Sequence, residues 1–249
     1  MKAILLAAGR GTRISKRIAD VPKCTLPVGN EPMIRRTVEM MLSLSIDPVV
    51  CVGYRKEKVY EALEGLPVAY YNNPFFDVTN SIGSLWFARR ELDDHAVIMN
   101  GDVFVSVELL NRLLAEERPV VMLADRSRVE AGDYFFYLDD DQRIVKYGKG
   151  LPLEERSAEY VGLAKISKDF MPSFKGRLEE LINSQQHNCW WEDVLYSYAE
   201  SGTQAIETMD VDGDFWSEID FIDDYERILR HVAEKSVSRN PVESAEVAR

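Results

Sequence analysis

The chain has 249 residues, a length within reach of one α/β domain, and 46% of them are hydrophobic, which is enough to bury a sizeable core. Its 42 acidic and 30 basic residues give a net charge of −12. Phosphate backbones and anionic lipids do not attract such a surface, so we expect neither nucleic acid nor a membrane among its partners. A local basic pocket for a small phosphorylated ligand is compatible with this charge balance.

Cysteine use and hydropathy indicate where the protein works. Cys24, Cys51 and Cys189 are widely spaced and include no Cys-x-x-Cys pair, which is typical of reduced thiols rather than of a disulfide framework. No apolar run approaches the roughly 18 residues that span a bilayer, and the first strand follows Met1-Lys2 without room for a secretion signal. We therefore expect a cytoplasmic protein. The sequence leaves its oligomeric state open, including whether it is a homodimer.

In the first half of the chain, short apolar runs alternate with stretches of helical periodicity. Strands are predicted over residues 2–8, 48–54, 68–73 and 96–105, and helices over residues 33–46, 56–66 and 81–92. Because strand and helix alternate, a mostly parallel sheet with helices on both faces is the favoured architecture.

The second half of the chain has a different pattern. Strands are predicted over residues 119–127, 134–148 with a turn at Asp139-Asp140-Asp141, and 159–167, and these read as antiparallel additions to the sheet. A further short strand is predicted over residues 204–211, and helices are predicted over residues 169–185, 191–201 and 214–235. We expect one domain over residues 1–235 and a flexible tail over residues 236–249, where apolar periodicity is lost.

The stretch LLAAGRGTR places two glycines and two arginines directly behind the first strand. Gly9 and Gly11 allow a tight turn whose backbone N–H groups approach a phosphate, while Arg10, Arg13 and the later Lys23 supply positive charge. A plain turn with solvated arginines is the alternative. The stretch lacks the third glycine of a dinucleotide-binding fingerprint and the Gly-Lys-Ser/Thr of a P-loop.

The first strand, its loop and two later dipeptides together form a specific pattern. It reads L-A-A-G-x-G-[ST]-R, then P-K, then P-[ML], and the matching residues are Leu6, Ala7, Ala8, Gly9, Gly11, Thr12, Arg13, Pro22, Lys23, Pro32 and Met33. This pattern resembles the start of the sugar-phosphate nucleotidyltransferase superfamily. The resemblance implies a three-layer, Rossmann-like α/β fold of the glycosyltransferase-A type, with a mostly parallel mixed sheet and an inserted antiparallel substrate lobe.

The resemblance also implies roles for the loop. Arg13 and Lys23 would neutralise charge at the α-phosphate of a nucleoside triphosphate, as the catalytic residues. The expected nucleotide half covers about residues 1–120 and the acceptor half about residues 121–235. The expected nucleotide contacts are Leu6, Ala7, Ala8, Gly9, Gly11, Thr12, Asn80, Ser81, Ser84 and Gly101.

Two acidic residues are candidates for metal binding. Asp102 follows a buried strand, and Asp220 lies where a short strand gives way to the last helix. Either one alone is as well explained as a cap or a turn. Because the superfamily takes its metal ligands from such positions, the resemblance implies that Asp102 and Asp220 hold Mg²⁺, which prefers oxygen ligands. Glu218, Asp223 and Asp224 are poorer candidates, expected on a solvated face or at the start of the helix.

Three further stretches of sequence suggest which nucleotide is the donor and which molecule is the acceptor. The segments YNN…SL, WWEDVLYSY and FWSEIDFIDDYERI resemble those of bacterial CTP:phosphocholine cytidylyltransferases and of the related 2-aminoethylphosphonate enzymes. This likeness implies CTP as the donor and phosphocholine or 2-aminoethylphosphonate as the acceptor, with pyrophosphate as the second product.

Aromatic and acidic side chains in the second half suit a cationic acceptor. Aromatic faces attract quaternary ammonium groups, by about 0.5–2 kcal/mol per contact, and carboxylates attract primary ones. Core packing is the alternative for the aromatic residues. The expected acceptor contacts are Tyr134, Tyr160, Trp190 and Trp191, together with the carboxylates Asp133 and Glu192.

Other functions remain as alternatives. A sugar 1-phosphate acceptor would need several hydroxyl partners, and aromatic residues outnumber these in the second half. A glycosyltransferase would normally show Asp-x-Asp where this chain has Asn100-Gly101-Asp102. A non-catalytic nucleotide-binding regulatory domain should lack one of the two metal carboxylates, whereas both Asp102 and Asp220 are present.

Overall fold

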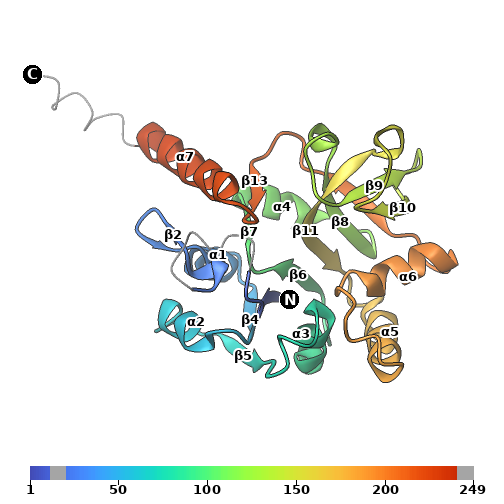
Figure 1. Cartoon of the computed structure of the whole chain (residues 1–249), viewed down its shortest axis with the longest axis horizontal. Helices are drawn as coiled ribbons and strands as arrows, with labels where there is room; N and C mark the ends of the chain where they lie inside the picture. The colour runs from blue at the N-terminus through green and yellow to red at the C-terminus, as the bar shows by residue number, and fades with distance from the viewer. Residues whose placement is uncertain (12–20, 240–249) are drawn as a thin grey trace, which may run out of the picture.

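The computed structural model describes residues 1–11 and 21–239, and a nine-stranded mixed sheet forms its centre (Figure 1). The sheet has the order β10-β9-β11-β6-β1-β4-β5, and β11 also pairs with β8, which in turn pairs with β12. The strands are β1 Lys2–Ala7, β4 Asp47–Val52, β5 Ala69–Asn72, β6 Ala96–Asn100, β8 Val120–Asp125, β9 Phe135–Leu138, β10 Ile144–Gly148, β11 Ala158–Ile166 and β12 Glu207–Asp210. Strands β5, β4, β1 and β6 run parallel, as predicted, and β11 is antiparallel to β6 and β8.

Strand β1 lies in the middle of the sheet because its side chains are apolar on both faces. Successive side chains of a strand point to opposite faces. Accordingly, Ile4 packs in one hydrophobic cluster, while Ala3 and Leu5 pack in another. All three are essentially inaccessible to solvent. A strand buried on both faces needs a layer of helices on each side.

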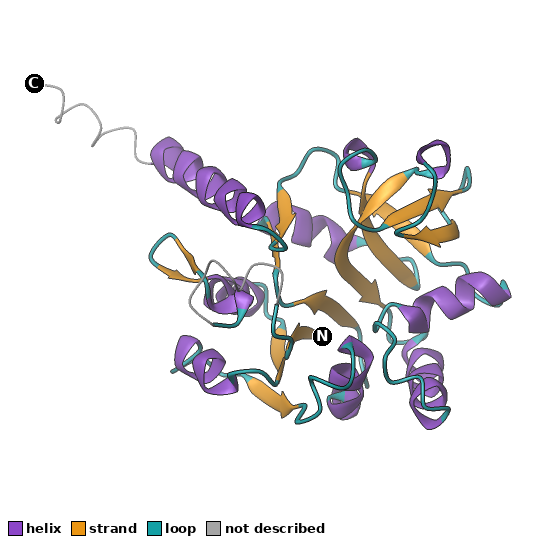
Figure 2. Cartoon of the chain, in the orientation of Figure 1, coloured by secondary structure: helices purple, strands orange, loops and turns teal. Residues whose placement is uncertain are grey.

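The helices supply these two layers (Figure 2). Side chains of α3, α5 and α6 belong to the cluster on the Ile4 face, and side chains of α1, α2 and α4 belong to the cluster on the opposite face. The expected three-layer α/β architecture is therefore confirmed. The helices are α1 Met33–Ser43, α2 Lys56–Ala62, α3 Ser81–Phe87, α4 Val107–Ala115, α5 Met171–Asn183, α6 Asp193–Ser201 and α7 Ile222–Arg239.

Two short ribbons attach the end of the chain to its beginning. Strand β13 (Trp216–Glu218) pairs antiparallel with β7 (Val103–Val105), and β2 (Pro27–Val28) pairs with β3 (Glu31–Pro32). Helix α7 packs through Ile228 against Val28 and Phe104 in a third hydrophobic cluster. These contacts bring the segment around Asp220 next to the carboxyl end of β6.

Three predicted elements differ from the structure. The apolar run at 96–105 is two strands, and α4, which follows it, was not predicted, although Ser106 caps it by accepting the Leu109 N–H at 3.2 Å. The predicted closing helix over 214–235 begins only at Ile222, because its first residues form β13. Helix α7 also extends beyond Ser236, into the segment expected to be a tail.

Within residues 1–11 and 21–239, no helix combines the length and the apolar character that a bilayer crossing requires. Short 3-10 helices complete the fold, and they are Lys23–Thr25, Arg89–Glu91, Arg126–Arg128 and Leu153–Glu155.

A glycine in β11 allows the strand to change register. Gly162 has a φ of +89°, and the pairing of β11 with β8 shifts between Tyr160 and Ala164. A Cβ at this position would lie 2.7 Å from Val103 Cγ2 and 3.2 Å from Asn100 Nδ2. The bulge therefore lets β11 pass close to the end of β6.

We expect Gly162→Ala to lower the free energy of unfolding by about 1–3 kcal/mol, because an alanine there is strained and crowded. Urea denaturation would measure the change. Gly176→Ala in α5 is the matched control, since a Cβ there meets no heavy atom within 4 Å and should stabilise the helix by about 0.5–1 kcal/mol. Equal effects of the two substitutions would contradict the assignment of a strained bulge.

Candidate active site

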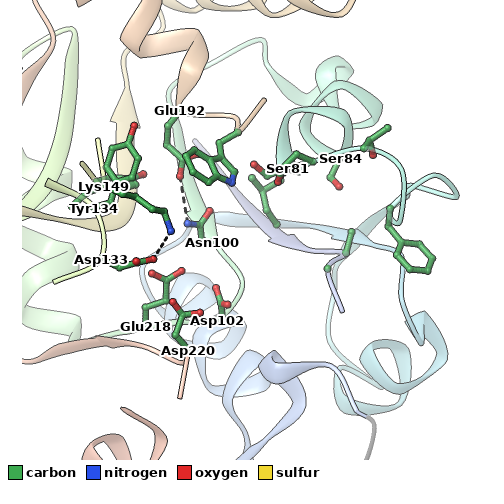
Figure 3. A pocket seen from close by; sticks show the side chains of 18 of the residues that line it. Ser81, Ser84, Asn100, Asp102, Asp133, Tyr134, Lys149, Glu192, Glu218 and Asp220 are labelled. Atoms are coloured by element: carbon green, nitrogen blue, oxygen red, sulfur yellow. Dashed lines mark hydrogen bonds and ion pairs between the residues drawn. The ribbon is translucent and has the colours of Figure 1, made fainter. Parts of the chain in front are cut away.

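A pocket opens at the carboxyl ends of β1 and β6, the edge at which open α/β sheets bind ligands (Figure 3). Side chains from both halves of the chain line it. They are Leu6, Ala8, Gly9, Phe76, Thr79, Asn80, Ser81, Ser84, Asn100, Asp102, Asp133, Tyr134, Lys149, Glu159, Tyr160, Trp190, Glu192, Tyr196, Glu218 and Asp220. We call the part around Asp102, Glu218 and Asp220 the carboxylate end, and the part around Tyr134, Tyr160, Trp190 and Tyr196 the aromatic end.

The carboxylate end contains an ion-paired lysine. Lys23 Nζ lies 2.8 Å from Asp220 Oδ1 and 3.1 Å from Asp102 Oδ2, and only 9% of the lysine side chain is exposed. Burial by itself would lower the pKa of Lys23, but the charges of Asp102 and Asp220 outweigh it and the pKa is raised. The structure therefore brings together a predicted catalytic residue and both predicted metal ligands, from three distant parts of the sequence.

Backbone contacts hold the two aspartates in place. The N–H of Ile219 donates to the carbonyl oxygen of Asp102 at 2.9 Å, which joins the two segments. Asp224 Oδ2 accepts the N–H groups of Asp220 at 3.2 Å and Phe221 at 2.8 Å. Asp224 thus lies at the start of α7, as expected, and organises the turn that carries Asp220.

Glu218 is closer to the site than the sequence indicated. It was expected on a solvated face or at the start of a helix, but it ends β13 and lines the pocket. Figure 3 shows its carboxyl group beside those of Asp102 and Asp220. Burial, together with the charges of Asp102 and Asp220, raises the pKa of Glu218 well above its usual value. The expectation failed because the pairing of β13 with β7, which buries this residue, is not a local property of the sequence.

The first loop lies beside Lys23. A second, smaller cavity is lined by Leu6, Ala7, Gly9, Gly11, Pro22, Lys23, Cys24, Gly101 and Asp102. Gly11 has a φ of +61°, and a Cβ on it would come within 2.5 Å of Lys23 Cγ. Gly101 is equally confined, since its Cβ would lie 2.8 Å from the carbonyl oxygen of Leu6. The expected phosphate-loop residues Thr12 and Arg13 lie outside the described residues.

The polar segment before α3 performs local capping and also faces the pocket. Asn80 caps α3 by accepting the Ser81 N–H at 2.8 Å, and Ser81 Oγ accepts the backbone N–H of Trp191 at 2.9 Å. The buried Asn73 donates to Thr79 Oγ1 and to Ser84 Oγ, both at 3.0 Å. Asn80, Ser81 and Ser84 are therefore placed at the pocket, as expected for nucleotide contacts, and their contacts with a nucleotide stay a prediction.

The aromatic end carries a cation that the sequence analysis missed. Lys149 Nζ lies 2.6 Å from Asp133 Oδ2 and 5.5 Å from the centre of the Trp190 ring. Its position between Gly148 and Gly150, in a sequence reading GKG, was the available signal. We expected the cation of the acceptor to bind between Asp133 and Trp190. In the structure, the ammonium group of Lys149 lies there instead.

Trp191 does not lie where it was expected. Its side chain is completely buried and does not line the pocket, whereas the neighbouring Trp190 does. The indole N–H of Trp191 donates to Asn100 Oδ1 at 3.0 Å. The expectation of a direct acceptor contact is therefore wrong, because the phase of the turn before α6 directs this ring into the core.

Glu192 forms part of the floor between the two ends of the pocket. Its side chain is buried, and Asn100 Nδ2 donates to its Oε1 at 3.4 Å (Figure 3). Burial raises the pKa of Glu192 to about 8, although its hydrogen bonds act in the opposite direction. Burial therefore favours the protonated form of this carboxyl group.

Comparison with known proteins identifies the family. The model of the MobA-like NTP transferase domain matches residues 3–198. The chain belongs to this family. The nucleotidyltransferase resemblance and the expectation of an enzyme are thereby confirmed.

Individual relatives agree with this assignment. The chain is 26% identical over 88% of its length to a CMP-5'-(3-aminopropyl)phosphonate synthase from Streptomyces rubellomurinus, of which it spans 37%. It is 27% identical over 99% of its length to a 2-aminoethylphosphonate cytidylyltransferase from Lancefieldella rimae, of which it spans 86%. The solved structure of a CTP:phosphocholine cytidylyltransferase from Streptococcus pneumoniae covers 93% of this chain, and the chain covers 98% of it, with a TM-score of 0.74 and 19% identity. This last likeness confirms the fold.

The two adjacent tryptophans should differ in their effect on stability. Trp191→Phe removes the partner of Asn100 and leaves a buried gap, so we expect the free energy of unfolding to fall by about 1–3 kcal/mol in urea denaturation. Trp190→Phe, at a side chain that is 39% exposed, is the matched control and should change stability by less than about 0.5 kcal/mol. A larger loss at Trp190 would reverse the assignment of core and pocket residues.

Proposed function

We propose that this protein is a cytidylyltransferase that moves CMP from CTP onto a small acceptor bearing an amino group and a phosphate or phosphonate. The observation that carries the proposal is the ion-paired position of Lys23 between Asp102 and Asp220, at 3.1 and 2.8 Å, directly beside the first loop. This arrangement supports the proposal, because a triphosphate donor needs cationic groups and carboxylates able to hold a metal ion beside its phosphates. The relatives whose names give an aminoalkylphosphonate support the choice of base and acceptor.

The residues present fit Mg²⁺. One oxygen each of Asp102 and Asp220 approaches the same nitrogen atom, so the two carboxylates converge on one point between them. Mg²⁺ commonly takes one or two carboxylates and completes its shell with water and substrate phosphates. When bound, the ion would neutralise charge on the phosphates of the donor. Lys23 would then be released toward the α-phosphate.

The reaction itself needs positioning more than proton transfer. An oxygen of the acceptor phosphate attacks the α-phosphorus of CTP, the bond from that phosphorus to the bridging oxygen of the β-phosphate breaks, and pyrophosphate leaves. The attacking oxygen is already ionised at neutral pH, so no general base is required. Lys23 and, by resemblance, Arg13 stabilise the charge at the α-phosphate, while Lys149 offers a second ammonium group to the acceptor phosphate.

If Lys23 and Asp102 act in catalysis, a single substitution at either residue should cause a large loss of activity. Lys23→Ala and Asp102→Ala should each reduce pyrophosphate release at least about a hundredfold, because each removes charge from the reacting centre. Circular dichroism would show that both variants are folded. Lys146→Ala is the matched control at an exposed lysine of β10, and it should keep its activity. Full activity in either site variant would refute the assignment.

Substrate choice is tested by measuring pyrophosphate release with the four common nucleoside triphosphates. Each is combined with phosphocholine, 2-aminoethylphosphonate and glucose 1-phosphate. We expect turnover with CTP and an amino-bearing acceptor. Turnover with glucose 1-phosphate alone would favour the sugar-phosphate alternative, and no turnover in any combination would favour a regulatory nucleotide-binding domain.

A further inference from the structure

We propose that Glu192 selects acceptors that end in a primary ammonium group, and that its carboxyl group releases a proton to solvent when the ammonium binds. The inference rests on the proposed cytidylyltransferase function and concerns the aromatic end of the same pocket. It separates two acceptor chemistries that the sequence left open, the quaternary ammonium of phosphocholine and the primary ammonium of an aminoalkyl phosphate or phosphonate.

The first argument is that the floor of the pocket offers hydrogen-bond acceptors. The hydroxyl groups of Tyr160 and Tyr196 are buried, and neither makes a hydrogen bond of good geometry among the described residues, although Tyr160 interacts with Glu192 and Tyr196 with Tyr134. Both residues line the pocket together with Glu192. Tyr160 lies beside Glu192, since burial and then the proximity of this carboxyl group raise the tyrosine pKa.

A buried polar group without a well-formed hydrogen bond is rare in a folded protein, and a water molecule, an ion or a ligand can supply the missing bond. A primary ammonium has three N–H donors and no acceptor, which matches one carboxyl group and two hydroxyl groups. A quaternary ammonium has no N–H group. It would add no well-formed hydrogen bond to either hydroxyl group.

The second argument is that the aromatic faces are already in use. The ring of Tyr196 stacks on that of Tyr147 at 4.1 Å and on that of Tyr134 at 5.7 Å between ring centres. The Trp190 face has Lys149 Nζ at 5.5 Å, and Trp191 is buried in the core. A quaternary ammonium usually binds in a cage of free aromatic faces. These side chains therefore do not provide such a cage.

The third argument concerns charge. Asp133 is paired with Lys149, and Glu159 is paired with Arg128 at 2.6 Å. Glu192 accepts a hydrogen bond from the neutral Asn100. It is therefore the pocket carboxyl group whose contacts suit a new cationic partner.

Several titratable groups face Glu192 from the surrounding elements. They are Tyr160 from β11, Tyr134 before β9, Tyr196 from α6, Asp193 next to it in the chain and Glu218 from β13. The tyrosines remain neutral, and the charge of Asp193 opposes ionisation of Glu192. An incoming ammonium reverses this balance, so the proton is lost on binding.

The experiment compares acceptors that differ only in methylation. Phosphoethanolamine and phosphocholine form one pair, and 2-aminoethylphosphonate and its N-trimethyl derivative form the other. For the wild type, we expect kcat/KM to be at least tenfold higher for the primary amine of each pair. Its acceptor KM should fall as the pH is raised from 6.5 to 8.5, because the ionised carboxylate becomes more populated.

Glu192→Gln keeps the shape of the side chain but cannot ionise. We expect it to raise the KM for the primary amines at least tenfold, to leave the KM for CTP within about threefold, and to abolish both the preference and the pH dependence. A wild type that uses the quaternary acceptors equally well, or a Glu192→Gln variant that keeps the preference, would overturn the proposal.

Calorimetry gives a readout that a merely structural role would not change. Titration of 2-aminoethylphosphonate at pH 7, in buffers of different ionisation enthalpy, should show more proton release from the wild type than from Glu192→Gln. The trimethyl derivative should show no such difference. Tyr160→Phe provides a second variant, expected to weaken binding of the primary amine only.

The outcomes separate this proposal from the proposed function. If CMP transfer occurs with quaternary acceptors alone, the function stands and the role of Glu192 fails. If no acceptor supports transfer from any nucleoside triphosphate, the function fails, and equal proton release by the wild type and the Gln variant would refute the role of Glu192 independently.

Discussion

The convergence of two carboxylates on one ammonium group, with the Glu218 carboxyl group beside them, is the interaction on which the rest of this structure depends. Two unit charges 4 Å apart repel or attract by about 4 kcal/mol at an effective dielectric constant near 20. Asp102, Glu218 and Asp220 therefore need a cation before β13 can lie against β7. In the structure Lys23 supplies it, while burial and the charges of Asp102 and Asp220 raise the pKa of Glu218. A lysine that balances this charge holds the segment of Asp220 in place, and under the proposed function it would yield to a metal ion and a triphosphate.

Three consecutive residues at the end of β6 connect the two ends of the pocket. Asn100 holds Glu192 on one side and Trp191 on the other. Gly101 is confined against the backbone of Leu6, where no side chain fits. Asp102 then turns toward Lys23. Because these residues are joined covalently, the distance between the carboxylate end and the floor of the aromatic end is set by the strand, and a small acceptor that reaches both has a defined length.

Local signals allowed much of the fold to be predicted from the sequence, including a ligand edge where glycines follow the first buried strand. Asp102 and Asp220 were predicted from the family resemblance, because either one alone is as well explained as a cap or a turn. Glu218 could not be placed, because its burial follows from the pairing of β13 with a strand more than a hundred residues earlier. The difference between Trp190 and Trp191 depends on the phase of one turn, and α4 was hidden by the apolar run that precedes it.

The number of aromatic residues did not identify the acceptor, because tyrosine and tryptophan side chains pack in protein cores as readily as they contact ligands. The property that distinguishes a core from a ligand site is whether buried polar groups lack hydrogen bonds after the rings have packed. A buried polar group without a partner costs about 1–3 kcal/mol, so a folded protein retains few of them. Here two tyrosine hydroxyl groups and a buried glutamic acid face the same cavity, while Lys23 and the two aspartates proposed to hold Mg²⁺ lie at its other end. Under the proposed function, a molecule with a phosphate for the lysine and the metal ion and with an N–H-bearing cation for the glutamic acid would match both ends, and a methylated cation would match only the first.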